Sequence, residues 1–432
     1  PLLIIEISIG KKTRLGVIGS VSQIMGKKFA WMGSFVAFVT TAIMFYYSVV
    51  TGWCLKYFFA TIFQNLIRRD SASFWNSFAL SRSWEPVLFH FLALGIGTAI
   101  IYSGVVKGIE KVNKILIPSL FFLLLVAAIR AVTLPSASDG LNFLFTVNLS
   151  SLGNFEVWLQ ALTQSAWSTG AGWGLILTYA VYTHKRENPI LTSTTIGFGN
   201  SLASLLAACA IIPTVFSYFS SQNLSQQDVF AEMVKNNEGL TFIWIPKLFA
   251  QIPAGSLFMA LFFLALSFAA FSSLISMIEL VTRIFIDAGL TRKKSVILVG
   301  TAGFLLGFPS AISMGFFKNQ DWVWSLGLLV SGLFFMIIVI RYGPTRFRNE
   351  IISTPDRKIR IGKWFNIVVM VLLPLQFLAM IAWWFHDSYT SSSGKWFSIF
   401  NSSSVGTVLF QWGLAILIFI LFNKTITKNI RR

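Results

Sequence analysis

Two adjacent hydroxyl side chains, Ser272 and Ser273, interrupt an apolar stretch that runs over residues 254–286. Na⁺ is a hard cation that prefers oxygen ligands, so such a pair could contribute to a sodium site. The same hydroxyls could instead donate to carbonyl groups of the preceding helical turn, which is the usual role of serine in an apolar helix. The pair by itself favours this second interpretation.

A glycine-rich segment, STGAGWG over residues 168–174, lies inside another apolar stretch. Each of its three glycines lowers helix stability by up to about 1 kcal/mol. Broken backbone hydrogen bonds at membrane depth are tolerated where the segment lines a cavity or binds something. The segment could therefore be a break in a helix whose free carbonyls bind an ion and a charged substrate. It could also be a place where small residues let helices pack closely, and the segment alone leaves both interpretations open.

Few other side chains inside apolar stretches could do chemistry. Asn200 and Ser204 share one helix face, and hydrogen bonding between helices is the alternative to a binding role. Asp287 and Asp321 lie near the ends of apolar stretches, where acids are either functional or solvated caps. Patterns typical of hydrolases, phosphate-binding loops and metal sites are absent from the sequence, so we expect no enzyme.

The elements that must position these residues are membrane spans. Of 432 residues, 55% are hydrophobic and 12% are charged, whereas a typical soluble domain has about 25% charged residues. A chain of this composition leaves more apolar surface than a soluble fold can bury, and lipid can cover it. The net charge of +18 comes from basic residues that lie mostly between apolar stretches, which indicates membrane topology and not nucleic acid binding.

The hydropathy pattern predicts ten full spans preceded by a short apolar stub over residues 1–9. A span needs about 20 residues, so the stub is interpreted as the tail of a helix that begins outside this chain. Two loops, 135–157 and 220–253, are long enough to be structured or functional. The predicted spans are 29–63, 86–106, 115–134, 158–182, 191–219, 254–286, 295–313, 322–341, 365–386 and 404–422.

The distribution of positive charge orients these spans. When the linkers are assigned alternately to two sides, one side holds 24 Lys and Arg residues and the other holds 8. Cytoplasmic loops carry the excess of Lys and Arg in membrane proteins. We therefore expect a multi-pass protein of the plasma (inner) membrane with a cytoplasmic C-terminus.

Five segments carry a resemblance to a known family. They are PLLIIEISIGKK at 1–12, YYSVVTGW at 46–53, GIEKVNKILIP at 108–118, DGLNFLF at 139–145 and STGAGWGLILTYAVY at 168–182. The chain resembles the neurotransmitter:sodium symporters, specifically their bacterial members. This resemblance implies an all-α membrane protein with the LeuT fold, which has two inverted five-helix repeats and two peripheral helices. One transmembrane domain would cover residues 1–432, with 1–134 as the remainder of the first repeat, 158–345 as the second and 364–423 as the peripheral helices.

The resemblance also implies roles for individual residues. Two sodium sites are implied, the first with Ser168 and Asn200 and the second with the carbonyl of Ala269 and the hydroxyls of Ser272 and Ser273. Asp321 and Asp287 match the acids of the outer and inner gates. The implied substrate pocket consists of Ile43, Tyr47, Trp167, Gly170, Trp173, Ser273 and Met277. Gln164, Ser168, Asn200 and Ser204 match a chloride site that animal members of the family carry.

The function implied by the resemblance is sodium-coupled symport of an amino acid or related small amine by alternating access. The partners would be this small solute and the surrounding lipid, a homodimer is possible, and no nucleic acid is expected. The family's first helix and half of its second are not in this chain, so the gate acids would lack the arginine partners that the first helix supplies. Two alternatives follow, a receptor-like or regulatory protein that binds a solute without moving it, and a truncated fragment that does not transport.

Overall fold

A computed structural model describes residues 1–81, 83–184, 186–221, 240–251, 253–352, 361–391 and 395–430. Within these residues the structure is helical and contains no β-strand. Eight of the described helices are long and apolar enough to cross a membrane, and a ninth span is bent by 59° between α20 (Val405–Leu421) and α21 (Asn423–Asn429). The eight are built on α3 (Ala30–Phe63), α5 (Glu85–Tyr102), α6 (Lys111–Val132), α10 (Pro189–Ser221), α14 (Gly255–Asp287), α15 (Arg292–Ile312), α16 (Met314–Tyr342) and α19 (Leu373–Ser391).

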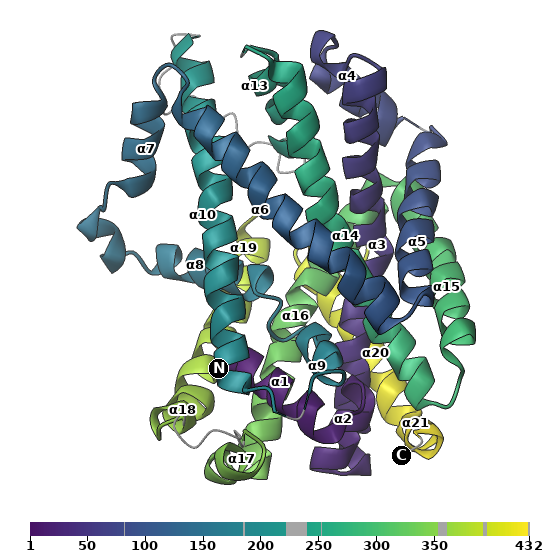
Figure 1. Cartoon of the computed structure of the whole chain (residues 1–432). Helices are drawn as coiled ribbons and strands as arrows, with labels where there is room; N and C mark the ends of the chain where they lie inside the picture. The colour runs from purple at the N-terminus through teal and green to yellow at the C-terminus, as the bar shows by residue number, and fades with distance from the viewer. Residues whose placement is uncertain are drawn as a thin grey trace.

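Shorter helices connect these spans or cover their ends (Figure 1). Single turns of 3₁₀ or π-helix extend several of them, such as η4 (Val105–Glu110) before α6 and η7 (Val368–Leu372) before α19. The short helices are α1 (Leu2–Thr13), α2 (Val17–Met25), α4 (Ser71–Trp75), α7 (Ala137–Phe145), α8 (Phe155–Ser168), α9 (Leu175–Ala180), α13 (Ile245–Ala250), α17 (Pro344–Glu350) and α18 (Trp364–Ile367).

The all-helical fold expected from the sequence is confirmed, and two of the predicted spans differ in detail. The predicted span 158–182 is two helices, because α8 ends at Ser168 and α9 begins only at Leu175. The predicted span 322–341 begins earlier, at Met314, where the Ser313 side chain caps the helix by accepting from the backbone N–H of Phe316. Asp321 therefore lies inside α16 and not at its start. Of the predicted long loops, 135–157 contains α7, whereas residues 222–239 lie outside the described residues.

Helix α3 is the central element of the molecule. It is apolar on all sides, and 72% of its most hydrophobic stretch is buried, against 22% for the peripheral α19. It packs against α14, α5, α16, α2 and α15. A Cβ atom at Gly52 would lie only 2.7 Å from the backbone carbon of Phe89, so this glycine allows α3 and α5 to approach closely.

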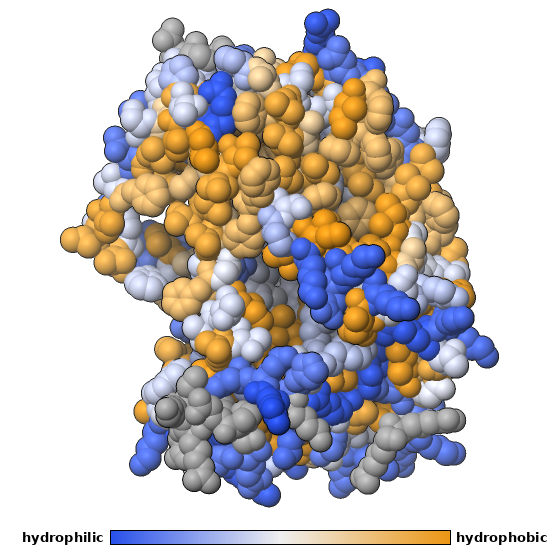
Figure 2. Space-filling model, in the orientation of Figure 1, coloured by the Kyte–Doolittle hydropathy of each residue, from blue (hydrophilic) through white to orange (hydrophobic). Residues whose placement is uncertain are grey.

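Two short helices, α1 and α9, form a unit near one end of the molecule (Figure 1). They touch backbone to backbone, since a Cβ atom at Gly10 in α1 would overlap the carbonyl of Leu177 in α9. Figure 2 shows a broad apolar surface over the upper part of the molecule and hydrophilic residues over this lower part. The face in that view is hollowed between the two regions. The α1–α9 unit thus lies at the hydrophilic end, where the charge distribution predicts the cytoplasm.

Candidate functional site

The break between α8 and α9 is held open by glycines and a buried acid. Gly170, Gly172 and Gly174 have φ values of +67°, +90° and +77°, which side chains other than glycine rarely adopt. Glu6 of α1 is fully buried, and its carboxylate accepts the N–H of Gly172 at 2.5 Å and of Leu177 at 3.4 Å. These bonds replace part of the hydrogen bonding that a continuous helix would provide. Of the two interpretations that the segment left open, the structure shows the helix break.

Thr40 of α3 adds a second anchor, because its hydroxyl donates to the carbonyl of Trp173 at 2.7 Å. The sequence predicted neither this contact nor the contacts of Glu6 with the break. These contacts join segments more than 130 residues apart, and no local pattern reports such a pairing.

The two side chains predicted for the first sodium site meet across α8 and α10. The amide nitrogen of Asn200 donates to the hydroxyl oxygen of Ser168 at 3.1 Å. Asn200 is half-buried and Ser168 is exposed. The other two candidate chloride residues lie one turn away on the same helices, Gln164 before Ser168 and Ser204 after Asn200. All four polar groups thus lie in two short helix segments that the Asn200–Ser168 bond brings together.

Ser272 and Ser273 of α14 make different contacts, one within the helix and one with another helix. Ser272 donates to the carbonyl of Ala269 at 2.8 Å, which is the common local role. Ser273 instead lies beside the hydroxyl of Tyr47 in α3. Two residues expected in the substrate pocket are therefore brought together between the two most closely packed long helices.

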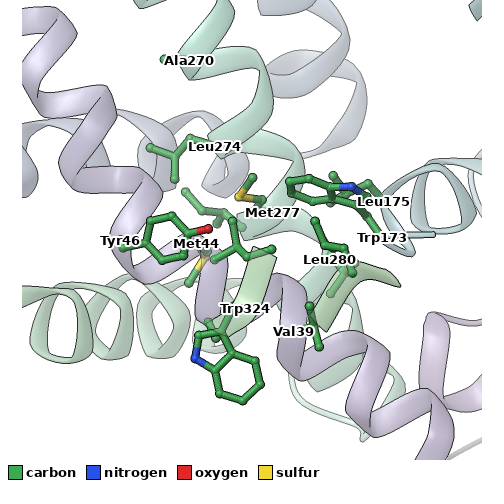
Figure 3. Packing of buried hydrophobic residues seen from close by; sticks show 14 of the residues in the cluster. Val39, Met44, Tyr46, Trp173, Leu175, Ala270, Leu274, Met277, Leu280 and Trp324 are labelled. Atoms are coloured by element: carbon green, nitrogen blue, oxygen red, sulfur yellow. The ribbon is translucent and has the colours of Figure 1, made fainter. Parts of the chain in front are cut away.

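Apolar side chains surround this position. Ile43 and Met277 are almost fully buried, and Trp173 is 5% exposed. The rings of Trp167 and Trp173 meet edge to face, with centroids 5.4 Å apart and planes at 81°. Figure 3 shows Met277 and Trp173 pointing toward one another from α14 and the unwound segment. The structure thus gathers the side chains expected as pocket walls into one apolar cluster.

Asp321, the expected outer-gate acid, lies beside a cavity of about 230 Å³ between α8, α16 and α19. Its carboxylate accepts the hydroxyl of Ser325 at 3.1 Å, and Ser325 is 3.3 Å from the hydroxyl of Tyr46 in α3. Trp167 lines the same cavity. The complete lining is Thr163, Trp167, Asp321, Trp322, Ser325, Leu326, Leu329 and Trp384.

Asp287, the expected inner-gate acid, has an arginine partner on its own helix. Arg283 forms an ion pair with Asp287 at 2.8 Å, and the backbone N–H of Gly16 donates to the same carboxylate at 2.6 Å. This partner comes from α14 itself and not from the family's first helix, so the expectation that the first-helix arginine is missing stays a prediction. The spacing of four residues on α14 is the signal that could have predicted the pair.

The oxygens at the candidate cation sites belong to hydroxyl, amide and carbonyl groups. In the part of the chain that the structure describes, no three His, Cys, Asp or Glu side chains cluster as a metal site would require. Neutral oxygens of this kind suit a monovalent hard cation better than they suit a transition metal.

Comparison with known proteins identifies the family. A sequence model of the sodium:neurotransmitter symporter family matches residues 1–86 and 87–428, which is nearly the whole chain. The chain belongs to this family. The symporter is 30% identical to an uncharacterized sodium-dependent transporter of Methanocaldococcus jannaschii, over 88% of this chain and 79% of that protein.

Two further relatives extend the comparison. The symporter is 27% identical to the human sodium- and chloride-dependent neutral and basic amino acid transporter B(0+), over 72% of this chain and 51% of that protein. Its fold matches the crystal structure of MhsT in complex with L-phenylalanine, with a TM-score of 0.76, 26% identity, and coverage of 88% of this chain and 87% of that chain. The symporter is therefore a multi-pass, sodium-coupled membrane transporter with a LeuT-like fold, and family and fold alike are those of transporters of small molecules.

Proposed function

We propose that the symporter couples the entry of Na⁺ to the uptake of an amino acid by alternating access. The observation that carries this proposal is the α8–α9 break, which has Ser168 bonded to Asn200 at one end and places Trp173 in the same apolar core as Ile43 and Met277. Discontinuous helices supply free backbone groups for ions and charged substrates at the middle of a membrane. The complex of MhsT with L-phenylalanine supports an amino acid as the substrate.

Two sodium sites follow from the oxygens at hand. Ser168 and Asn200 supply a hydroxyl and an amide oxygen for the first. The carbonyl of Ala269 and the hydroxyls of Ser272 and Ser273 supply the second. Ser272 can bind a cation while it donates to Ala269, because a hydroxyl that donates one hydrogen bond keeps two lone pairs.

The substrate pocket has a polar end and an apolar end. The hydroxyl of Tyr47 can donate to a substrate carboxylate, which can also complete the shell of a nearby Na⁺ and so couple the two fluxes. The substrate side chain would be enclosed by Ile43, Met277, Trp167 and Trp173. The backbone at Gly170, which carries no side chain, would bind the ammonium group of the substrate. The indole N–H of Trp173 is buried and has no hydrogen-bond partner among the described residues. A substrate with a polar acceptor on its side chain would satisfy this donor.

The test is uptake of amino acids by proteoliposomes under an inward Na⁺ gradient. Ser272→Ala and Ser273→Ala should each raise the Na⁺ concentration for half-maximal uptake about tenfold, because a lost oxygen ligand costs on the order of 1.4 kcal/mol. Ser267→Ala is the matched control, since this buried α14 hydroxyl donates to Phe263 at 2.7 Å away from the site. An unchanged Na⁺ response in both variants contradicts the second sodium site.

The same assay separates the alternative functions. Binding of an amino acid without accumulation would favour a receptor-like protein, and neither binding nor accumulation would favour a fragment that does not transport. For the chloride site we propose Gln164, Ser168, Asn200 and Ser204, and uptake that persists unchanged in gluconate would contradict it.

The organisation of the protein completes the proposal. We assign residues 1–134 to the first repeat, 158–345 to the second and 364–423 to the peripheral helices of one domain. We place the protein in the plasma (inner) membrane with its C-terminus in the cytoplasm. The lipid-facing peripheral helices leave room for a homodimer.

A further inference from the structure

Arg283 is a mostly buried cation near the hydrophilic end of α14. Its side chain is 18% exposed, and the Asp287 side chain with which it pairs is 6% exposed. A buried charge destabilises the fold unless it is paired. The residues that pair with Arg283 therefore indicate its role. The resemblance implies a gate role for Asp287, whereas nothing so far assigns a role to Arg283.

The partners of Arg283 come from three separate segments. One guanidinium nitrogen lies 2.8 Å from the Asp287 carboxylate and also donates to the backbone carbonyl of Arg14 at 3.0 Å. The guanidinium lies over the ring of Tyr182, 5.6 Å from its centroid. Asp287 in turn accepts the N–H of Gly16 at 2.6 Å. The pair therefore joins α14 to the turn after α1 and to the segment after α9.

Those two segments belong to a unit that is already tied together. α1 and α9 pack backbone to backbone at Gly10, and Glu6 of α1 holds the start of α9 through Leu177. At the far end of α9, Arg14 donates to the carbonyl of Val181 at 2.8 Å. α1 and α9 therefore form one packed unit, and the Arg283–Asp287 pair lies across the boundary between this unit and α14.

A second ionic contact lies nearby but has a different arrangement. Glu279 of α14 pairs with Arg292 at the start of α15 and accepts the hydroxyl of Tyr182 at 2.7 Å. This contact reaches α9's end through a neutral hydroxyl. The Arg283–Asp287 pair instead contacts the turn after α1 through both of its charged groups, because Arg283 donates to the carbonyl of Arg14 and Asp287 accepts the N–H of Gly16.

We propose that Arg283 is the cation of the cytoplasmic gate, acting from within α14. In the closed state it holds the turn 14–16 and the end of α9 on α14, and opening toward the cytoplasm requires these contacts to separate. The motion in this statement rests on the alternating access proposed above. Arg283 is a positioning residue, since it contacts neither the pocket residues nor the candidate sodium ligands.

The test is the accessibility of a cysteine placed beneath the gate. Ser276 lies between α9 and α14, where its hydroxyl contacts that of Tyr179 at 2.7 Å. Ser276→Cys, in a background with Cys54 and Cys209 replaced by alanine, is labelled with a methanethiosulfonate reagent from the cytoplasmic side. We expect Arg283→Ala to raise the labelling rate about tenfold, which corresponds to a shift of about 1.4 kcal/mol toward the open state. Arg283→Lys, which keeps the charge but loses the planar fork, should give a smaller rise.

A matched control and a coupled variant make the test specific. Arg346→Ala breaks another arginine–carboxylate ion pair at the same spacing of four residues, but the Arg346–Glu350 pair is exposed on α17 and should leave labelling unchanged. The double variant Arg283→Ala, Asp287→Ala should be labelled no faster than the faster of the two single variants. Each substitution alone already breaks the same ion pair, so the second adds little. If Arg283→Ala does not fold, Asp287→Asn provides the same comparison with the Gly16 contact retained.

Labelling at the wild-type rate in a folded Arg283 variant overturns the proposal, and so do additive effects of the two substitutions. The labelling assay needs neither Na⁺ nor substrate. A rise in labelling without amino acid uptake would therefore leave the gate assignment intact and count against the proposed transport function alone.

Discussion

At the scale of single residues, Glu6 shows how a buried carboxyl group can replace missing backbone hydrogen bonds. The break in the helix leaves N–H groups without intrahelical partners, and the carboxyl oxygens of Glu6 accept two of them. A buried N–H group that is left without an acceptor costs about 1–3 kcal/mol. The carboxyl group therefore stabilises a conformation that the glycines only permit.

Substitution of Glu6 should destabilise the folded protein. Glu6→Ala removes both acceptors and should cost about 3 kcal/mol of unfolding free energy, whereas Glu6→Gln keeps one oxygen and should cost about half as much. Thermal unfolding in detergent micelles measures both. Glu156→Gln, an exposed acid at the start of α8, is the control and should stay within about 0.5 kcal/mol of the wild type. A Glu6→Ala protein that melts with the wild type would show that the contact contributes little.

The residue types of the site could be predicted from the sequence, whereas their partners could not. Three glycines in five residues predict a break, and a resemblance gives roles to Ser272 and Ser273. That Thr40 donates to the carbonyl of Trp173, or that Arg283 donates to the carbonyl of Arg14, depends on how distant helices are placed against one another. The Arg283–Asp287 pair differs in having a local signal, because its two residues are four apart on α14.

At the scale of elements, the three glycines of the break are not equivalent. Gly170 has a positive φ but no atom within 4 Å of the place where a Cβ would lie. Gly172 also has a positive φ, and its Cβ would lie 3.0 Å from the backbone of Gly332 in α16. The first glycine is needed for conformation alone, and the second for conformation and for close packing against another span.

Alanine substitutions should separate these two effects. Gly170→Ala should cost about 1 kcal/mol through left-handed backbone strain, and Gly172→Ala about 2 kcal/mol because steric overlap is added. Gly413→Ala is the matched control in α20, where the helix is regular and the space is open, and it should be neutral or stabilising by up to about 1 kcal/mol. Melting temperatures in detergent give the order. Equal losses for Gly170→Ala and Gly172→Ala would contradict the packing role.

Span positions could be predicted from hydropathy because each long helix must match a membrane about 30 Å thick. The ends of helices were less predictable. They depend on local hydrogen bonds, such as the Ser313 cap on α16, and a hydropathy pattern contains no information about these bonds. This is why α16 begins eight residues before the predicted span and encloses Asp321.

At the scale of the whole molecule, the charge distribution defines two sides. The hydrophilic end in Figure 2 is the end at which α1, α2, α17 and α21 lie in Figure 1. The positive-inside rule assigns this end to the cytoplasm. The Arg283–Asp287 pair lies at this same end. This position agrees with the proposed cytoplasmic gate, because the solute would be released into the cytoplasm.

Cysteine labelling in intact cells should confirm this orientation. In a background without Cys54 and Cys209, the exposed positions Lys395→Cys and Lys428→Cys report on the two sides. A membrane-impermeant maleimide should label the first and not the second, and inverted vesicles should give the reverse. Labelling of Lys428→Cys in intact, sealed cells would contradict a cytoplasmic C-terminus.

The burial of α3 determines which substitutions the protein can accept during evolution. A helix enclosed on every side must keep the shape of each face, so nearly every position along it is constrained by neighbours that would have to change at the same time. A helix such as α19, with most of its surface toward lipid, needs only to stay apolar. Random mutation should therefore be tolerated unevenly along this chain, with neutral variation concentrated in the outer helices and compensating pairs of changes around α3.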